Sequence, residues 1–350
     1  MYSDEIYMQR ALELAVLGSG YVSPNPMVGC VIVHQGKIIG EGWHKCYGES
    51  HAEVNAVRSV ADKTLLPEAT AYVTLEPCSH HGKTPPCADL LIQHRLKRVV
   101  ISNVDTNPLV GGQGIIKLQQ AGIEVTTGIL EAQGRLLNSR FFTFMEKKRP
   151  YLLLKWAETA DGFIARPNYD SKWISSELSR KLVHQWRAQE DGVLVGTRTA
   201  LYDNPKLNVR DWQGRNPVRM VIDTQLQLPS TLHLFDHSQL TLCFNHLKEE
   251  SQENLEYIKI KPEHEILPQI LKNLHERKVQ SLIVEGGSQL LNSFIQLDLW
   301  DEVRLFRSRQ LFEEGIKAPL FNGLLSEHSY LYEDELLYFR PTKTGLSVKK

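Results

Sequence analysis

The chain has 350 residues, of which 42% are hydrophobic and 23% are charged, a composition typical of globular domains with ordinary cores. Lys and Arg total 40 against 41 Asp and Glu, which gives a formal net charge of -1. No overall basic excess therefore favours binding to nucleic acid or to an anionic membrane.

The first residues, Met1-Tyr-Ser-Asp-Glu-Ile-Tyr-Met8, are polar and acidic, unlike the basic start and apolar run of a signal peptide. The sequence contains no apolar run near the ~18 residues that would cross a bilayer. Five cysteines spread along the chain do not resemble a disulfide framework. We therefore expect a cytoplasmic protein with no membrane partner, whose cysteines are thiols or metal ligands.

The first half of the chain predicts a three-layer α/β domain. Apolar side chains at helical spacing predict an amphipathic helix over residues 5–17. The elements expected next are a hairpin over 29–40, a helix over 51–60, a strand over 71–75, a helix over 86–94 and a strand over 98–102. The basic, proline-ended segment Lys147-Lys-Arg-Pro150 is the expected linker. We place the domains at residues 1–147 and 148–350.

The second half predicts a separate α/β domain with a mostly parallel sheet, because strand-like and helical stretches alternate along it. Strands are expected over residues 151–155, 192–195, 218–222, 240–244 and 281–284. Helices are expected between several of them, at 178–189 and 266–276.

A candidate zinc site lies in the first half, at His51-Ala-Glu53, Pro77-Cys78 and Cys87. Zinc deaminases carry H-x-E followed by P-C-x-x-C, and one imidazole with two thiolates leaves a coordination position open for water. Glu53 is then expected to move protons.

We expect His51 in the first turn of its helix and Cys78 at the start of the next helix, where the helix N-terminus favours a thiolate. Eight residues, rather than two, separate Cys78 from Cys87. The residues alone therefore also fit two unrelated buried thiols and a surface histidine.

The runs at 24–33, 51–53 and 74–87 resemble the deaminase domain of the bifunctional deaminase/reductase family of riboflavin biosynthesis, which has the same long cysteine spacing. The resemblance implies a cytidine-deaminase-like fold, one Zn²⁺ bound by His51, Cys78 and Cys87, and Glu53 as the catalytic acid/base. It also implies a substrate pocket lined by Asn25, His44, Lys83, Asp105 and Asn107.

A dinucleotide-binding Gly-x-Gly-x-x-Gly sequence after a strand is absent from the second half, and the run Gly111-Gly-Gln-Gly114 lies in the first half without the third glycine. Glycines do follow two predicted strands, at Gly196 and at Gly286-Gly287. They would let a phosphate approach the backbone at a helix N-terminus, although from the spacing alone ordinary strand–helix turns are the better explanation.

The runs at 155–162, 171–175, 196–210 and 285–287 resemble the reductase half of the same family. The resemblance implies a dihydrofolate-reductase-like α/β fold that binds NADPH. The implied NADPH contacts are Ala157, Trp173, Thr199, Asp203, Thr224, Gly287, Ser288, Gln289, Leu290, Leu291, Asn292 and Ser293. The implied substrate contacts are Ser171, Arg187, Leu207, Arg210 and Glu285, and the two arginines suit a ribose phosphate. Thr159, Phe163 and Asn208 depart from the family pattern.

The resemblance implies hydrolytic deamination of 2,5-diamino-6-(5-phosphoribosylamino)pyrimidin-4-one by a zinc-activated water, followed by NADPH-dependent reduction of the ribose of 5-amino-6-(5-phosphoribosylamino)uracil. Lys155 is expected to polarise or protonate the sugar. The alternatives are a nucleoside or tRNA deaminase with an accessory domain, and a non-enzymatic zinc-binding module. The expected partner is a small phosphoribosyl pyrimidine rather than nucleic acid, and base rates favour a homo-oligomer, a dimer or tetramer.

Overall fold

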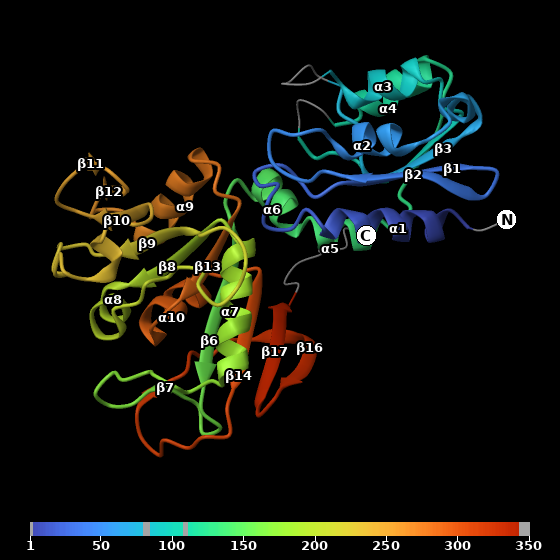
Figure 1. The fold of residues 1–350 in the computed structure, drawn as a ribbon. Coiled ribbons are helices and arrows are strands. Elements are labelled where there is room, and N and C mark those ends of the chain that lie inside the picture. Colours follow the sequence, from blue (N-terminus) through green and yellow to red (C-terminus); the bar gives the residue numbers. More distant parts are fainter. Residues whose placement is uncertain (1–2, 80–84, 108–110, 343–350) are drawn as a thin grey trace, which may run out of the picture. The chain divides into compact units, whose positions relative to one another are not determined.

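The helix α6 (Ser139–Lys147) ends at Lys148, whose backbone is left-handed, and β6 (Tyr151–Glu158) begins three residues later. The chain divides at this point into two units, Met1–Lys148 and Arg149–Lys350, which can be followed from blue to green and from green to red in Figure 1. The computed structural model describes residues 3–79, 85–107 and 111–342. Among these residues, every helix is too short or too polar to cross a lipid bilayer.

The first unit is built on a five-stranded sheet of order β2-β1-β3-β4-β5. The expected hairpin is confirmed: β1 (Gly29–His34) pairs antiparallel with β2 (Lys37–Trp43) and, on its other side, with β3 (Thr70–Leu75). Strands β3, β4 (Arg98–Asn103) and β5 (Glu124–Thr127) run parallel. The carboxyl ends of β3 and β4 therefore lie at one edge of the sheet, where ligand-binding loops commonly gather.

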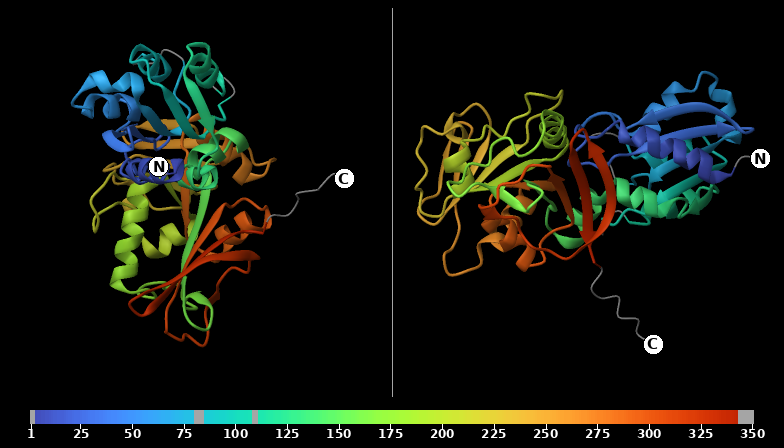
Figure 2. Two further views of the ribbon diagram at one scale, coloured as in Figure 1. Left: turned by 90° about the vertical axis from the view of Figure 1, so that its right-hand side faces the viewer. Right: turned by 90° about the horizontal axis from the view of Figure 1, so that it is seen from below.

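Helices cover both faces of this sheet, which confirms the three-layer arrangement. In β1, Val31 and Val33 pack with α1 (Asp4–Val16), whereas Cys30 and Ile32 pack with the helices of the opposite face. Those helices are α2 (Ala52–Ser59), α3 (Cys87–Gln93) and α4 (Gln113–Gln120), and Figures 1 and 2 show them across the sheet from α1. The remaining helices are the 3₁₀ turn η1 (Lys63–Glu68), α5 (Glu131–Leu137) and α6.

The contact between α1 and β1 is close enough to require a glycine. A Cβ at Gly29 would lie 1.9 Å from the carbonyl oxygen of Ala11. We expect Gly29→Ala to destabilise the first unit by about 1–3 kcal/mol, because backbone must move to relieve the overlap. Urea unfolding of the full chain measures this loss. Gly122→Ala is the comparison: a Cβ at this exposed residue would meet nothing within 4 Å, so with φ at +81° the substitution causes backbone strain alone. An unchanged midpoint for Gly29→Ala would contradict the expectation.

The second unit contains a ten-stranded sheet of order β11-β12-β10-β9-β8-β13-β6-β14-β17-β16. Its central strands, from β12 to β14, run parallel, and β11, β17 and β16 are antiparallel. The bounds are β8 Gly192–Gly196, β9 Val218–Ile222, β10 Thr241–Asn245, β11 Glu250–Gln252, β12 Leu255–Lys259, β13 Ser281–Glu285, β14 Glu302–Arg307, β16 Gly323–Leu331 and β17 Asp334–Pro341. The mostly parallel sheet predicted from sequence is confirmed.

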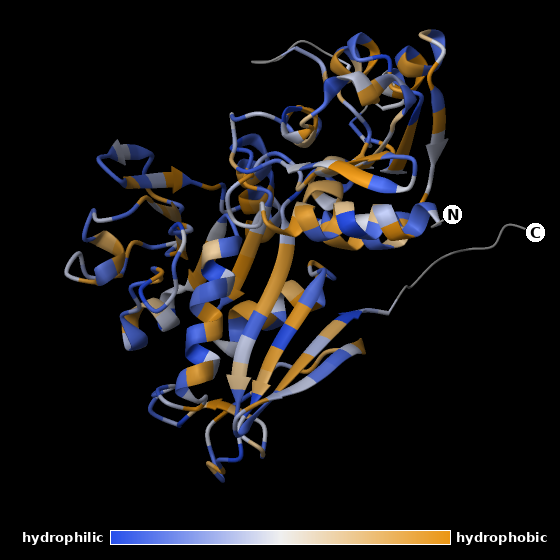
Figure 3. Ribbon diagram, turned by 45° about the vertical axis from the view of Figure 1, so that its right-hand side comes forward, coloured by the Kyte–Doolittle hydropathy of each residue, from blue (hydrophilic) through white to orange (hydrophobic). Residues whose placement is uncertain are grey.

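Two hydrophobic clusters cover the faces of this sheet. One packs α9 (Ile266–Glu276) and α10 (Ser288–Gln296) against one face, and the other packs α7 (Glu177–Gln189) and η2 (His233–Phe235) against the opposite face. Figure 3 shows the central strands coloured mainly as hydrophobic, as expected for strands buried on both sides. The short helix α8 (Thr197–Asp203) follows β8 directly, and a small sheet joins β7 (Phe163–Ala165) to β15 (Ile316–Lys317). The carboxyl ends of β6, β8 and β13 thus open toward α8 and α10.

Candidate active sites

Three side chains of the first unit form a cluster that could hold a metal ion. The ligand atoms of His51, Cys78 and Cys87 all lie within 4.8 Å of one another. His51 Nδ1 is 3.6 Å from the Cys78 sulfur and 3.3 Å from the Cys87 sulfur. A tetrahedral zinc with Zn–N of about 2.0–2.1 Å and Zn–S of about 2.3 Å separates N from S by roughly 3.5 Å. The spacing of these atoms therefore fits zinc.

The position expected for Cys78 is wrong, because α3 begins at Cys87 and Cys78 lies in the preceding loop. Pro86 disfavours a helical conformation in Pro85, so a helix cannot run through this position, and Pro86 is the N-cap of α3. The backbone N–H of Cys87 still donates to the Cys78 sulfur at 3.3 Å. The Cys87 thiol, then His51 and this N–H group, hold the pKa of Cys78 well below its usual range against the effect of burial, and the contact with Cys78 raises the pKa of Cys87.

His51 is the N-cap of α2, one position before the first turn in which it was expected. Glu53 follows within the first turn of α2 and is only 3% exposed. Burial, followed by the charge of Cys78, raises the pKa of Glu53 to about 7. A carboxyl group with that pKa can take up and release a proton near neutral pH.

Asn25 and His44 meet beside this cluster. Asn25 Nδ2 lies 3.1 Å from His44 Nε2, and the His44 ring packs edge-on against His51 at 5.4 Å between centroids. The loop that carries Asn25 is held by Asn138, whose side-chain amide exchanges two 2.8 Å hydrogen bonds with the backbone of Met27. Sequence reasoning missed Asn138, since it stands 111 residues from Met27 and has no local pattern.

The segment that carries Asp105 and Asn107 follows β4 and forms a tight turn. Asp105 Oδ1 accepts the backbone N–H of Asn107 at 2.8 Å. The turn therefore starts at the carboxyl edge of the sheet, the edge from which β3 leads toward Cys78. Lys83, the fifth residue expected in this pocket, lies outside the described residues.

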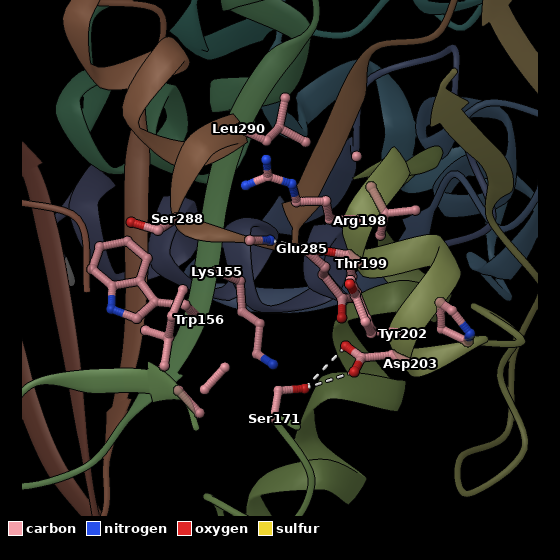
Figure 4. Close-up of a pocket in the computed structure, with 18 of the residues that line it drawn as sticks. Lys155, Trp156, Ser171, Arg198, Thr199, Tyr202, Asp203, Glu285, Ser288 and Leu290 are labelled. Carbon is pink, nitrogen blue, oxygen red and sulfur yellow. Dashed lines mark hydrogen bonds between the residues drawn. The ribbon is translucent and has the colours of Figure 1, made fainter. Parts of the chain in front are cut away.

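The second unit contains a cavity of about 1170 Å³ at the carboxyl ends of β6, β8 and β13. Lys155 enters it from β6, three residues before that strand ends, and Figure 4 shows its amine pointing toward Ser171. On the other side, the Thr199 hydroxyl of α8 accepts the backbone N–H of Gly287 at 2.8 Å, which ties α8 to the start of α10. A Cβ at Gly286 would lie 3.0 Å from the same hydroxyl, and φ at this residue is +151°, so the tight contact and the backbone conformation together favour a glycine.

Charged side chains meet at the base of the cavity. Glu285 forms a two-point ion pair with Arg187, with Nε–Oε1 at 2.7 Å and Nη2–Oε2 at 2.8 Å. Burial opposes ionisation of Glu285, but the charges of Arg187 and Lys155 outweigh it and hold its pKa at about 2. Burial lowers the pKa of Lys155, partly offset by the charge of Glu285. The cavity thus holds a fixed carboxylate next to an amine that gives up its proton more readily than a free lysine.

The segment 169–175 forms one wall of the cavity. The Ser171 hydroxyl lies 3.0 Å from both carboxylate oxygens of Asp203 (dashed in Figure 4). Tyr169 stacks on Tyr202 with centroids 4.7 Å apart, so two contacts join this wall to α8. Trp173 is 67% exposed and carries the Arg180 guanidinium over its ring at 4.3 Å. An exposed indole at the cavity mouth offers a flat apolar surface for a ligand.

Most residues expected in the reductase site line this one cavity. They are Lys155, Ala157, Ser171, Trp173, Arg187, Thr199, Asp203, Leu207, Arg210, Glu285, Gly287, Ser288, Gln289, Leu290, Asn292 and Ser293. Thr224 is outside this lining, and Leu291 faces the hydrophobic core. Three of the five N–H groups of Arg187 are already used, because Glu285 accepts from Nε and Nη2 and the Asn208 carbonyl accepts from Nη1 at 3.3 Å, which leaves one N–H on each Nη for a phosphate.

Two family models match the chain, one in each unit. The cytidine and deoxycytidylate deaminase zinc-binding region matches residues 1–103, and the RibD C-terminal domain matches residues 150–308. The riboflavin biosynthesis protein RibD of Aquifex aeolicus is 41% identical over 89% of this chain and 89% of its own length. The chain belongs to the RibD family. RibD of Escherichia coli is 40% identical, over 88% of each chain.

Solved RibD structures agree with this fold along the chain. A diaminohydroxyphosphoribosylaminopyrimidine deaminase/5-amino-6-(5-phosphoribosylamino)uracil reductase from Thermotoga maritima is 39% identical, with a TM-score of 0.88 over 97% of this chain and 99% of its own. RibD of Acinetobacter baumannii is 35% identical, with the same TM-score and coverage. The chain is thus a RibD deaminase/reductase of riboflavin biosynthesis, with a cytidine-deaminase-like first unit and a RibD reductase second unit. This family membership favours the bifunctional enzyme over the two alternative functions considered from sequence.

Proposed function

We propose that residues 1–147 deaminate 2,5-diamino-6-(5-phosphoribosylamino)pyrimidin-4-one and that residues 148–350 reduce the ribose of 5-amino-6-(5-phosphoribosylamino)uracil to a ribityl chain. One observation carries the first step: the buried Glu53 lies two residues from His51, whose ring meets the thiols of Cys78 and Cys87. A catalytic zinc site needs three such protein ligands with an acid/base beside them.

In the deaminase step, His51, Cys78 and Cys87 would hold one Zn²⁺ per chain. A zinc ion there supplies a water that ionises near pH ~7. Glu53 takes a proton from the attacking water and delivers protons to the ring nitrogen and the leaving ammonia. Its buried position two residues from His51 suits both transfers. Asn25, His44, Lys83, Asp105 and Asn107 are proposed to hold the pyrimidine.

In the reductase step, the cavity of the second unit would hold NADPH and the phosphoribosyl pyrimidine together, and NADPH supplies the hydride. The segment from Gly287 to Ser293, with Ala157, Trp173, Thr199, Asp203 and Thr224, is proposed to bind the cofactor. Ser171, Arg187, Leu207, Arg210 and Glu285 are proposed to bind the substrate. Lys155, held in the cavity by β6, is proposed to protonate the sugar oxygen as the ring opens.

The two steps predict different responses to metal removal. After chelation of zinc, NADPH oxidation with the diaminopyrimidinone should fall by at least about 100-fold, because the attacking water is no longer activated. Oxidation with the deaminated pyrimidine should persist, since the described residues of the reductase cavity include no cysteine. Absorbance at the reduced nicotinamide band measures both rates, and re-addition of zinc is the control. An equal loss of NADPH oxidation with both substrates would contradict the assignment of the two steps to separate sites. If the untreated protein oxidises NADPH with neither substrate, the reductase step is rejected.

We further propose that the protein is cytoplasmic and forms a dimer or tetramer. Closed homo-oligomers are the commonest assemblies of soluble enzymes. Light scattering at several concentrations tests the assembly, and a monomer at all of them would reject it.

A further inference from the structure

The side chain of Glu76 is a buried carboxylate that belongs to neither set of proposed catalytic residues. It stands between β3 and Cys78, and it is 4% exposed. Its oxygens accept four backbone N–H groups. Oε2 accepts from Asp105 at 3.2 Å and from Gly112 at 2.9 Å, and Oε1 accepts from Gly114 at 2.8 Å and from Ile115 at 3.4 Å. All four donors come from the chain after β4, 29 to 39 residues away.

The hydrogen bonds to Glu76 explain why the run Gly111-Gly-Gln-Gly114 is rich in glycine, although it is not a nucleotide-binding sequence. Gly112 is the N-cap of α4 with a left-handed φ of +80°, and three of the four donors belong to this N-cap and the first turn. Such N–H groups have no partner inside the helix and favour a negative charge. A Cβ at Gly114 would lie 2.0 Å from the Pro77 carbonyl oxygen. The glycines therefore let α4 approach the carboxylate and the backbone next to it.

The carboxylate joins two parts of the deaminase site. On one side, the chain continues from Glu76 through Pro77 directly to Cys78, a proposed zinc ligand. On the other side, the bond to the Asp105 N–H holds the turn that carries Asp105 and Asn107, two proposed substrate contacts. The backbone N–H of Glu76 also donates to the Asn103 carbonyl at 3.0 Å, which continues the pairing of β3 with β4.

We propose that Glu76 is a positioning residue for the deaminase reaction, which fixes the turn at Asp105–Asn107 relative to the segment that carries Cys78. The proposal rests on the deaminase function proposed above. Both carboxylate oxygens take part, because Oε2 accepts the N–H group of Asp105 in the turn and Oε1 accepts those of Gly114 and Ile115 in α4. An amide at this position presents an NH₂ group to two N–H donors, so one side of the contact must open.

The test is Glu76→Gln in the full-length, zinc-loaded chain, with Glu68→Gln as the matched control. Glu68 is an exposed carboxylate of the same unit, 3.3 Å from Lys97. We expect Glu76→Gln to raise the KM for the diaminopyrimidinone by about tenfold to 100-fold, with a smaller fall in kcat, because the substrate turn is displaced while the metal ligands remain. The zinc content, the absorption of the cobalt-substituted protein and the reductase rate on the deaminated substrate should match those of the control.

Deaminase KM and kcat equal to those of Glu68→Gln would overturn the proposal. So would a loss of deaminase activity that only follows a loss of zinc, because Glu76 would then serve the metal site alone. If Glu76→Gln does not fold, Gly114→Ala pushes the first turn of α4 away from Pro77 and so weakens the bonds from Gly114 and Ile115 to Glu76, and a normal KM in that variant would count against the proposal. Absence of deaminase activity in both the unmodified chain and Glu68→Gln would instead reject the proposed deaminase function.

Discussion

Replacing Glu53 with glutamine is expected to lower the deaminase rate by about 10²-fold to 10⁴-fold, the usual contribution of a positioned acid/base. Glutamine fills the same buried space next to the proposed zinc ligands, but it cannot accept or deliver a proton near neutral pH. The reductase rate on the deaminated pyrimidine should not change, because Glu53 lies in the other unit. Ammonia release measures the first rate, and NADPH oxidation measures the second.

The exposed carboxylate of Glu68 again provides the control, since Glu68→Gln removes a charge from the same unit without touching the buried cluster. Zinc content should be equal in both variants and in the unmodified chain. A Glu53→Gln protein that retains zinc and more than about a tenth of the deaminase rate would show that another group moves the protons.

Sequence periodicity predicted the elements well where one face or both faces are buried. The helix expected at 266–276 is α9 with the same bounds, because its apolar residues Leu267, Ile270, Leu271 and Leu274 fall on one side. The apolar run at 281–284 is β13, which is buried throughout. In such segments the local pattern and the tertiary environment select the same structure.

The contacts that shape the two sites could not be predicted, because they join residues far apart in sequence. Asn138 and Met27 are separated by 111 positions, and Arg187 and Glu285 by 98. The sequence indicated that Arg187 could bind a phosphate, but only the fold shows that Glu285 accepts hydrogen bonds from two of its nitrogens. The helix expected over 86–94 is confirmed as α3 to within one residue at each end, and only the placement of Cys78 at its start was wrong.

Replacing Lys155 with methionine is expected to lower the reductase kcat by about 10²-fold to 10³-fold, because the cavity then lacks its proposed proton donor. Methionine keeps an unbranched apolar stem of similar length, so the wall at β6 should remain. NADPH binding, measured by fluorescence titration, should therefore change little, and the deaminase rate should match that of the unmodified chain. Lys181→Met, at an exposed position of α7, is the matched control.

The pH dependence of the reductase gives an independent test of Lys155. Burial lowers the pKa of its ammonium group, although the charge of Glu285 partly restores it. A group that must donate a proton is active below its pKa and inactive above it. The kcat of the unmodified chain should therefore fall as pH rises, at a pH below that at which a free lysine titrates. Because methionine has no proton to lose, this fall should be absent from the residual rate of Lys155→Met. The same alkaline fall in both proteins would assign the proton donation to another group.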